Sequence, residues 1–301
     1  MSAHHGAHIQ TRLRGAFAIG IVLNIVIVVA EVLAGYFSNS MALVADAGHN
    51  LTDILSLVLA GGALWFAQRP TSTRRTYGFR RATILAALAN ALILILVSIG
   101  LAWGSLARIF VPQPVNEPIV IVVAAFAVVV NGITALLFLK DQRRDLNVRA
   151  VFLHMAADAA LSLGVVLSAI GVLVSGWLRL DPAMSLIIVI AILWTTWGLL
   201  RESFDLSLDA VPKNIDSDAV RSYLRGLPAV SEVHHLHVWA MSTSEVALTA
   251  HLVKPDGVLD DALLARVRLE LHERFGIGHV ALQLERGDGA RPGCGVERPQ
   301  S

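Results

Sequence analysis

The chain has 301 residues, of which 55% are hydrophobic and 16% charged, with a mean hydropathy of +0.64 and a formal net charge of +1. Soluble domains carry roughly 25% charged residues, so this composition is typical of a membrane protein. The small net charge gives no reason to expect nucleic-acid binding, which needs a strongly basic face. A single cysteine, Cys294, excludes an intrachain disulfide framework and a cysteine-rich metal cluster within one chain.

Six long apolar segments make up the first two thirds of the chain. Each is close to the roughly 20 residues needed to span a bilayer. The first is too long for a signal-peptide core and lacks an obvious cleavage site. We therefore predict an α-helical membrane domain with spans at 13–36, 41–66, 82–108, 117–140, 148–175 and 182–203.

The segments that flank these spans have a different composition. The polar N-terminus contains His4, His5 and His8. We interpret it as a disordered terminus or, alternatively, as a weak metal-collecting arm. A soluble composition follows the last span, and the final residues are rich in Gly, Pro and Arg, which predicts disorder. The expected domains are the N-terminus 1–12, the membrane domain 13–208, a soluble domain 209–287 and the tail 288–301.

Positive charge is concentrated in the loops on one side of the expected membrane domain. Loop 67–81 contains five arginines, and loop 140–149 contains Lys140 and three arginines. The loops on the other side together contain only Arg179. Because positively charged loops stay in the cytoplasm, we expect both termini to be cytoplasmic.

Two of the expected spans carry the same pair of ionisable residues. The fifth span contains His154 and Asp158, and the second contains His49 and Asp53. A spacing of four places each His and its Asp on one helix face. Two such helices facing each other bring together two imidazoles and two carboxylates, a set suited to a tetrahedral divalent metal such as zinc. Ionisable residues inside a membrane span are costly and mark candidate functional sites.

The two His–Asp pairs have two alternative interpretations besides a metal-transport site. In the first, each His–Asp pair is a hydrogen bond that locks two helices together. This explains the repeated spacing poorly, because Ser or Asn makes such contacts at lower cost. The second is an intramembrane metalloenzyme, which needs an open ligand position for water. A closed set of four ligands leaves no such position, and the sequence has no HExxH motif.

Two further acidic residues lie in the expected spans. Glu31, in the first span, is open to three interpretations: a proton carrier, a partner for a nearby cation, or a residue near the water interface. Asp46 lies seven residues before Asp53, on the same helix face but two turns away. We expect Asp46 to line the path to the outer side rather than to bind the metal.

The soluble domain has a mixed helix and strand pattern. Asp216 or Ser217 is suited to cap its first helix, and alternating apolar residues predict three strands. The order αββαβ predicts a small ferredoxin-like α+β domain with its helices on one face of the sheet. The expected elements are a helix that ends near Arg225, strands at 230–241 and 245–253, a helix at 260–275 and a strand at 279–285.

Histidines are frequent in the soluble domain. In its first strand, alternation places His235 and His237 on one face and His234 on the other. His234, together with His251 on the neighbouring strand and Glu285 on the last, is a candidate second metal site. For any single one of these histidines the alternative is an ordinary surface residue.

Five motifs spread over almost the whole chain are highly specific in combination. They are NSMALVADAGHNLTD (39–53), TYGFRRATILAALANA (76–91), LNVRAVFLHMAADAALSLGVV (146–166), DPAMSLIIVIAI (181–192) and VHHLHVWAMSTSEVALTAHLV (233–253). Together they resemble the cation diffusion facilitator family. Within that family the chain is similar to the bacterial zinc/cadmium/cobalt resistance exporters and to the animal zinc transporters.

This resemblance implies a homodimer with six spans in each protomer and a cytoplasmic metal-binding domain. It also implies export of a divalent metal, zinc first and cadmium or cobalt next, across a bacterial inner membrane in exchange for protons. A His at the first ligand position is typical of zinc-preferring members. The transport site of relatives corresponds to His49, Asp53, His154 and Asp158. Their cytoplasmic site corresponds to His234, His251 and Glu285, with His279 as a further candidate.

The chain departs from the family pattern in three places. The loop after the second span contains neither His nor Asp, so we predict that the extra metal site some relatives carry there is absent. The loop between the fourth and fifth spans is short rather than long and His-rich. Cys294 is single and follows a Gly/Pro stretch, so we do not expect it to be a ligand.

The expected mechanism is alternating access around the transmembrane site. Imidazole must be neutral and carboxylate ionised to bind zinc, so zinc binding displaces protons. Zinc at the cytoplasmic domain is then expected to act as a regulator as well as a substrate. The alternative function is a membrane sensor or scaffold that binds metal without transporting it, and a flux assay distinguishes the two.

Overall fold

The computed structural model describes residues 23–139, 146–255 and 261–287. The N-terminal histidines, residues 13–22 of the first expected span, Cys294 and the predicted disordered tail lie outside this range. The described chain forms two units. The first unit consists of the described chain up to Gly62 together with Ala86–Arg201. The second consists of Ala63–Leu85 together with the described chain from Glu202 onward.

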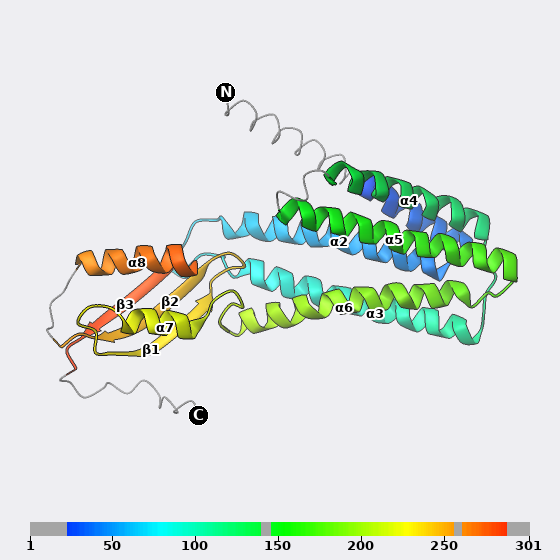
Figure 1. Ribbon diagram of the computed structural model, residues 1–301. Coiled ribbons are helices and arrows are strands. Elements are labelled where there is room, and N and C mark those ends of the chain that lie inside the picture. Colours follow the sequence, from blue (N-terminus) through cyan, green and yellow to red (C-terminus); the bar gives the residue numbers. More distant parts are fainter. Residues whose placement is uncertain (1–22, 140–145, 256–260, 288–301) are drawn as a thin grey trace, which may run out of the picture. The chain divides into compact units, whose positions relative to one another are not determined.

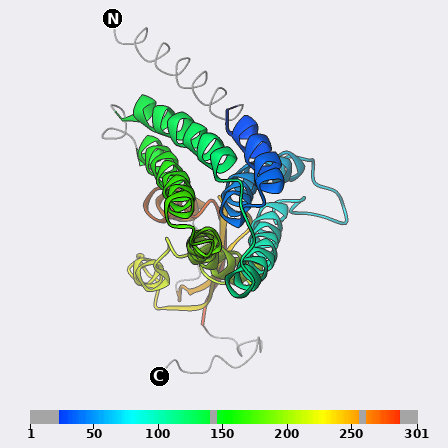
Figure 2. The same cartoon turned by 90° about the vertical axis from the view of Figure 1, so that its right-hand side faces the viewer.

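The predicted helical membrane domain is confirmed. Five helices of the described chain are long and apolar enough to cross a bilayer, and the apolar helix Leu23–Ser38 is the described part of the first span. Figure 2 shows these helices end-on, running beside one another. The five are α2 (Met41–Ala67), α3 (Ala82–Phe110), α4 (Glu117–Phe138), α5 (Leu146–Ser175) and α6 (Leu180–Ser207), labelled in Figure 1.

Small residues allow these helices to approach closely. The buried cluster of the membrane unit is rich in alanine, including Ala42, Ala45 and Ala124. Lipid is as apolar as the side chains, so close van der Waals packing rather than the hydrophobic effect holds such helices together. Gly164 of α5 lies where no larger residue fits without a shift, because a Cβ there would lie 2.5 Å from Cε of Met184 on α6.

The second unit contains the αββαβ elements in the predicted order. Strands β1 and β2 are antiparallel, and β2 and β3 are parallel. Asp216 is the N-cap residue of the first helix and accepts hydrogen bonds from the backbone N–H groups of Asp218 and Ala219, at 2.9 and 3.0 Å. The elements are α7 (Ser217–Arg225), β1 (Glu232–Ala240), β2 (Val246–Val253), α8 (Asp261–Phe275) and β3 (His279–Glu285).

Both helices of this unit pack on one face of the sheet. Leu224 of α7 and Val267 of α8 share a buried cluster with Leu248 and Leu252 of β2. Because successive side chains of a strand point to opposite faces, His251 faces away from the helices. The sheet therefore keeps one face apolar and leaves the other to polar residues.

The start of α2 is held by a carboxylate from α6. The carboxylate of Asp181 accepts hydrogen bonds from the hydroxyl of Ser40, from the backbone N–H of Met41 at 2.7 Å and from that of Ala42 at 3.4 Å. Ser40 Oγ in turn accepts from the N–H of Leu43 at 3.1 Å. The first backbone N–H groups of α2, which no turn of the helix can satisfy, are thus all bonded. We call this arrangement of Asp181, Ser40 and the first turn of α2 the α2–α6 clamp.

We expect Asp181→Ala to destabilise the membrane unit by about 2 kcal/mol or more, because it leaves buried N–H donors without partners. A loss of that size corresponds to a fall of roughly 5 °C in the unfolding temperature, measurable on the full-length protein in detergent. Asp181→Asn is the matched control, since its amide oxygen still accepts and its loss should be smaller. Equal unfolding temperatures for all three proteins would contradict the capping role.

Candidate metal centres

The structure brings the two predicted His–Asp pairs together between α2 and α5. His49 Nε2 lies 3.3 Å from Oδ1 of Asp158, and His154 Nε2 lies 3.3 Å from Oδ2 of Asp53. Each histidine therefore pairs with the aspartate of the other helix, and His154 is also 3.7 Å from Asp158. Ligand atoms of His49, Asp53 and Asp158 lie within 4.8 Å of one another, close enough to hold one metal ion. We call these four residues the transmembrane site.

The four side chains differ in burial. Asp158 is 1% exposed and His49 is 17% exposed, whereas Asp53 and His154 are 27% and 44% exposed. The oxygens of Asp158 and Oδ2 of Asp53 are buried, and the imidazoles of His49 and His154 lie 3.3 to 3.7 Å from them. The donor set of two imidazoles and two carboxylates suits zinc. The site thus has one buried wall and one more accessible edge.

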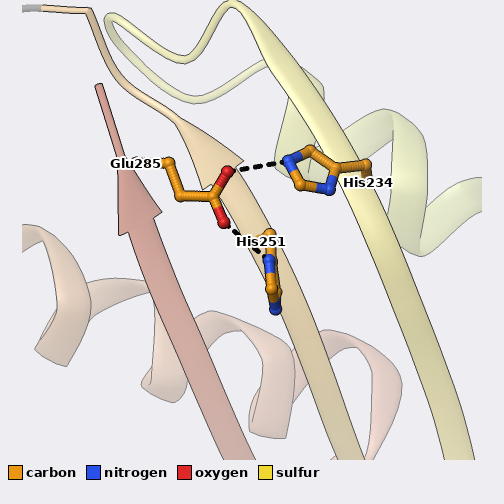
Figure 3. Close-up of side chains that lie close together, drawn as sticks. All are labelled: His234, His251 and Glu285. Atoms are coloured by element: carbon orange, nitrogen blue, oxygen red, sulfur yellow. Dashed lines mark hydrogen bonds and ion pairs between the residues drawn. The ribbon is translucent and has the colours of Figure 1, made fainter. Parts of the chain in front are cut away.

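A second group gathers on the polar face of the sheet. His234 of β1, His251 of β2 and Glu285 of β3 come from three adjacent strands, and Figure 3 shows the carboxylate reaching both imidazoles. His234 Nε2 is 3.0 Å from Oε2 of Glu285, and His251 Nδ1 is 2.7 Å from Oε1. We call these three residues the sheet site.

The electrostatics of the sheet site favour an ionised carboxylate. Desolvation raises the pKa of Glu285, but the hydrogen bond from His251 and the hydrogen bond and charge of His234 together lower it below its ordinary value. An ionised carboxylate between two imidazoles is a set of donors that divalent zinc accepts.

The structure does not bring His279 into the sheet site. His279 begins β3 and pairs with Ala247, whereas Glu285 ends β3 and pairs with Val253. Six residues of extended strand, about 20 Å, separate the two. The ring of His279 lies instead 5.6 Å from that of Tyr77.

A histidine that sequence reasoning placed elsewhere lies beside the sheet site. The pairing of β1 with β2 is interrupted between His234 and His237, and His235 has a φ of +48°. The ring of His235 consequently lies 5.1 Å from the rings of both His234 and His251. The predicted alternation, with His234 and His235 on opposite faces, is wrong because a bulge breaks the period of two. Only the run of three histidines in four residues hinted at it.

The left-handed backbone conformation of His235 predicts how substitutions at this position differ in stability. A residue with a Cβ loses about 1–2 kcal/mol in this conformation, which glycine avoids. We expect His235→Gly to be more stable than His235→Ala, and the matched His237→Gly to be less stable than His237→Ala. Amide hydrogen exchange of β1 and β2 in the full-length protein measures the difference. Greater stability of the alanine variant at both positions would contradict the strain.

Comparison with known families covers both units. Residues 17–206 match the family model of the cation efflux transmembrane domain, and residues 212–287 match that of the cation efflux protein cytoplasmic domain. Together the two matches cover nearly all of the described chain.

Individual relatives agree with these matches. The zinc transporter ZitB of Shigella flexneri is 33% identical over 97% of this chain and 95% of its own length. The cation efflux system protein CzcD of Alcaligenes sp. (strain CT14) is 33% identical over 89% and 85%. The cadmium, cobalt and zinc/H(+)-K(+) antiporter of Bacillus subtilis (strain 168) is 32% identical over 85% and 84%. The chain therefore belongs to the cation efflux family, the cation diffusion facilitators, and is a multi-pass membrane transporter of metal cations rather than an enzyme.

Proposed function

We propose that this cation efflux protein exports zinc from the cytoplasm in exchange for protons, by alternating access at the transmembrane site. The observation that carries the proposal is the convergence of two imidazoles and two carboxylates between α2 and α5, with each His paired to the Asp of the other helix. Zinc takes four such ligands in a tetrahedral arrangement. Replacing the two cross-helix ion pairs by one metal ion keeps both helices joined while the cargo is bound.

Proton exchange is supported by the chemistry of the same four ligands. A lone pair that binds zinc is the lone pair that otherwise binds a proton, so the two cations compete. Histidine carries out this exchange at ordinary pH because its reference pKa is near 6.5. Carboxylates inside a membrane are costly without a cation. Protons that arrive as zinc leaves therefore let the empty site cross back without uncompensated negative charge.

The choice of zinc is supported by ligand type and by the relatives. Imidazole with carboxylate suits zinc and also cobalt, and affinity alone does not select one metal. Among the similar proteins, one is named a zinc transporter and another a cadmium, cobalt and zinc antiporter. We therefore place zinc first, with cadmium and cobalt as secondary substrates.

The proposed setting is a homodimer in a bacterial inner membrane with both termini in the cytoplasm. Support for the dimer comes from the match of residues 212–287 to the cytoplasmic domain of the family. Support for the orientation comes from the arginine-rich loop 67–81, because positive loops stay in the cytoplasm.

We expect Asp158→Ala and His154→Ala to abolish zinc transport while leaving the fold intact. Loss of an outer-shell partner already costs ten- to a hundredfold at metal sites, so loss of a ligand should lower the rate by about a hundredfold or more. The measurement is zinc uptake into proteoliposomes under an imposed pH gradient, followed with a zinc-sensitive dye inside. Glu117→Gln, which removes an acid at the start of α4, is the control and should transport normally.

Three outcomes of this assay separate the hypotheses. Uptake driven by the gradient in the parent and the control alone supports antiport at the transmembrane site. Uptake at the parent rate by Asp158→Ala contradicts the site. Zinc binding without uptake by the parent replaces the transporter with the binding-only alternative.

The sheet site is proposed to sense cytoplasmic zinc. It lies on the face of the sheet that the helices leave free, and His251 and Glu285 are partly exposed there. Within the same unit, the connection that leads from α2 to α3 is joined to the sheet domain, since Arg80 pairs with Glu245 at 2.7 Å and Arg81 pairs with Asp209. Metal at the sheet site can therefore act on a segment that continues into two spans.

We expect the double variant His234→Ala/His251→Ala to raise the zinc concentration for half-maximal transport by about tenfold, equivalent to 1.4 kcal/mol of lost coupling. Initial rates of uptake over a zinc series measure it. The control is His237→Ala/His272→Ala, which removes two exposed histidines outside the sheet site. An unchanged zinc dependence in the first variant would contradict a sensing role.

A further inference from the structure

Two acidic side chains next to the transmembrane site have no part in metal binding as described above. Glu31, on the helix Leu23–Ser38, is 0% exposed, and Asp46, on α2, is 1% exposed. Each carboxyl group accepts one hydrogen bond at one oxygen. Nδ2 of Asn50 donates to Glu31 Oε2 at 2.9 Å, and the hydroxyl of Ser162 donates to Asp46 Oδ2 at 2.7 Å.

The other oxygen of each carboxyl group has no hydrogen-bond donor among the described residues. Glu31 Oε1 and Asp46 Oδ1 are buried, and no N–H or O–H group of the described residues donates to either. Asn50, which donates to Glu31, follows Asp46 by four residues on α2, so Glu31 lies against the helix face that carries Asp46. The two carboxyl groups also interact electrostatically. One proton shared by the two groups supplies the donor that these oxygens lack.

The described parts of the two helices that carry the pair supply no fixed positive charge. The sequence contains no Lys or Arg between Arg14 and Arg69. The titratable groups that act on the pair are Asp158 of α5 and, for Asp46, His49 of the same helix. Residues 82–107 of α3 and the part of α4 after Glu117 contain no ionisable side chain. Two adjacent carboxylates cannot both stay ionised in such surroundings without a proton or another cation.

We propose that Glu31 and Asp46 form an acid pair that holds one shared proton when the transmembrane site is empty and releases it when a divalent metal binds there. The pair is thus a proton-binding site for the exchange, separate from the metal ligands. As a role in transport it rests on the proposed antiport function.

The position of the pair explains the coupling. Asp46 precedes His49 by one helical turn, about 4.5 Å along the axis. Ser162, which bonds Asp46, follows Asp158 by one turn on α5. A divalent ion among the ligands therefore acts on the pair over a short distance in a low dielectric, and it favours the ionised carboxylates.

The exchange balances in charge and protons. With the site empty, the pair carries one proton and a charge of −1. When the metal arrives with its charge of +2, the pair loses that proton to the aqueous side to which the site is then open and its charge becomes −2. When the metal leaves, a proton from the opposite side restores the pair. One proton per metal is moved in this way, in addition to any that the ligands exchange.

A proton suits the pair better than a second zinc ion does. Zinc sites in proteins are built mainly from nitrogen and sulfur donors, and the pair offers oxygen alone. A hard cation such as magnesium or calcium takes six or more oxygens, whereas each of these carboxyl groups has one oxygen already committed to a hydrogen bond.

Infrared difference spectroscopy of the full-length protein tests the proposal directly. Adding zinc to the metal-free parent should remove a protonated-carboxyl C=O band that shifts in D₂O. Glu31→Gln should lose that part of the band, because the amide N–H supplies the missing donor to Asp46 and no shared proton is needed. Glu117→Gln, an acid-to-amide change away from the pair, should retain it.

Proton counting gives the second readout. Calorimetric zinc titrations in buffers of different ionisation enthalpy measure the protons released per zinc. Glu31→Gln should release about one proton fewer than the parent and bind the same number of zinc ions per protomer. If Glu31→Gln does not fold, Asp46→Asn replaces it with the same expectation.

Any other result of these two measurements contradicts the proposed acid pair. A parent with no zinc-sensitive protonated carboxyl has no shared proton to release. A variant that releases as many protons as the parent shows that the pair is only structural, and a variant that binds one zinc fewer shows that the pair holds metal. Neither measurement requires transport, so a protein that passes both but fails the flux assay keeps its acid pair and loses only the antiport function.

Discussion

The carboxylate of Asp158, 1% exposed among apolar helices, is the constraint on which the transmembrane site depends. An anion at such a position needs a cation or a proton. His49 of α2 and His154 of α5 lie next to its two oxygens, and the contact with His49 joins α2 to α5. Small residues in the surrounding cluster then let the helices close to the distance that the contacts require.

The elements that depend on local signals were predictable from the sequence. Hydropathy marked the spans to within four residues of their observed ends, because a bilayer imposes both length and apolarity. A cap at Asp216 or Ser217 and the order of helices and strands along the second unit were predicted from equally local patterns, and the structure has Asp216 as the cap. The repeated spacing of His and Asp predicted which side chains share a face, and the structure places all four together. Their assignment as metal ligands stays a prediction.

The features that depend on distant parts of the chain were not predictable. Asp181 bonds to Met41 at the start of α2, which lies 140 residues earlier in the sequence. Ser162 bonds to Asp46, which lies 116 residues earlier. Neither contact leaves a trace in composition or periodicity. The bulge at His235 was missed for a different reason, because a left-handed residue there is set by the pairing of β1 with β2 and is rare for any side chain other than glycine.

The α2–α6 clamp restricts how the transporter changes shape. Because the first turn of α2 is bonded to α6, we expect that end of α2 to act as a pivot rather than to slide past its neighbour. His49 lies about 12 Å along α2 from Met41, and Gly62 lies about 31 Å along it. A tilt of α2 about the clamp therefore displaces the distant turns more than twice as far as the ligand turn. In the proposed alternating access, such a tilt would open a path for water at the far end of α2 while the proposed ligands stay close together, so the metal becomes accessible to water while it is still bound.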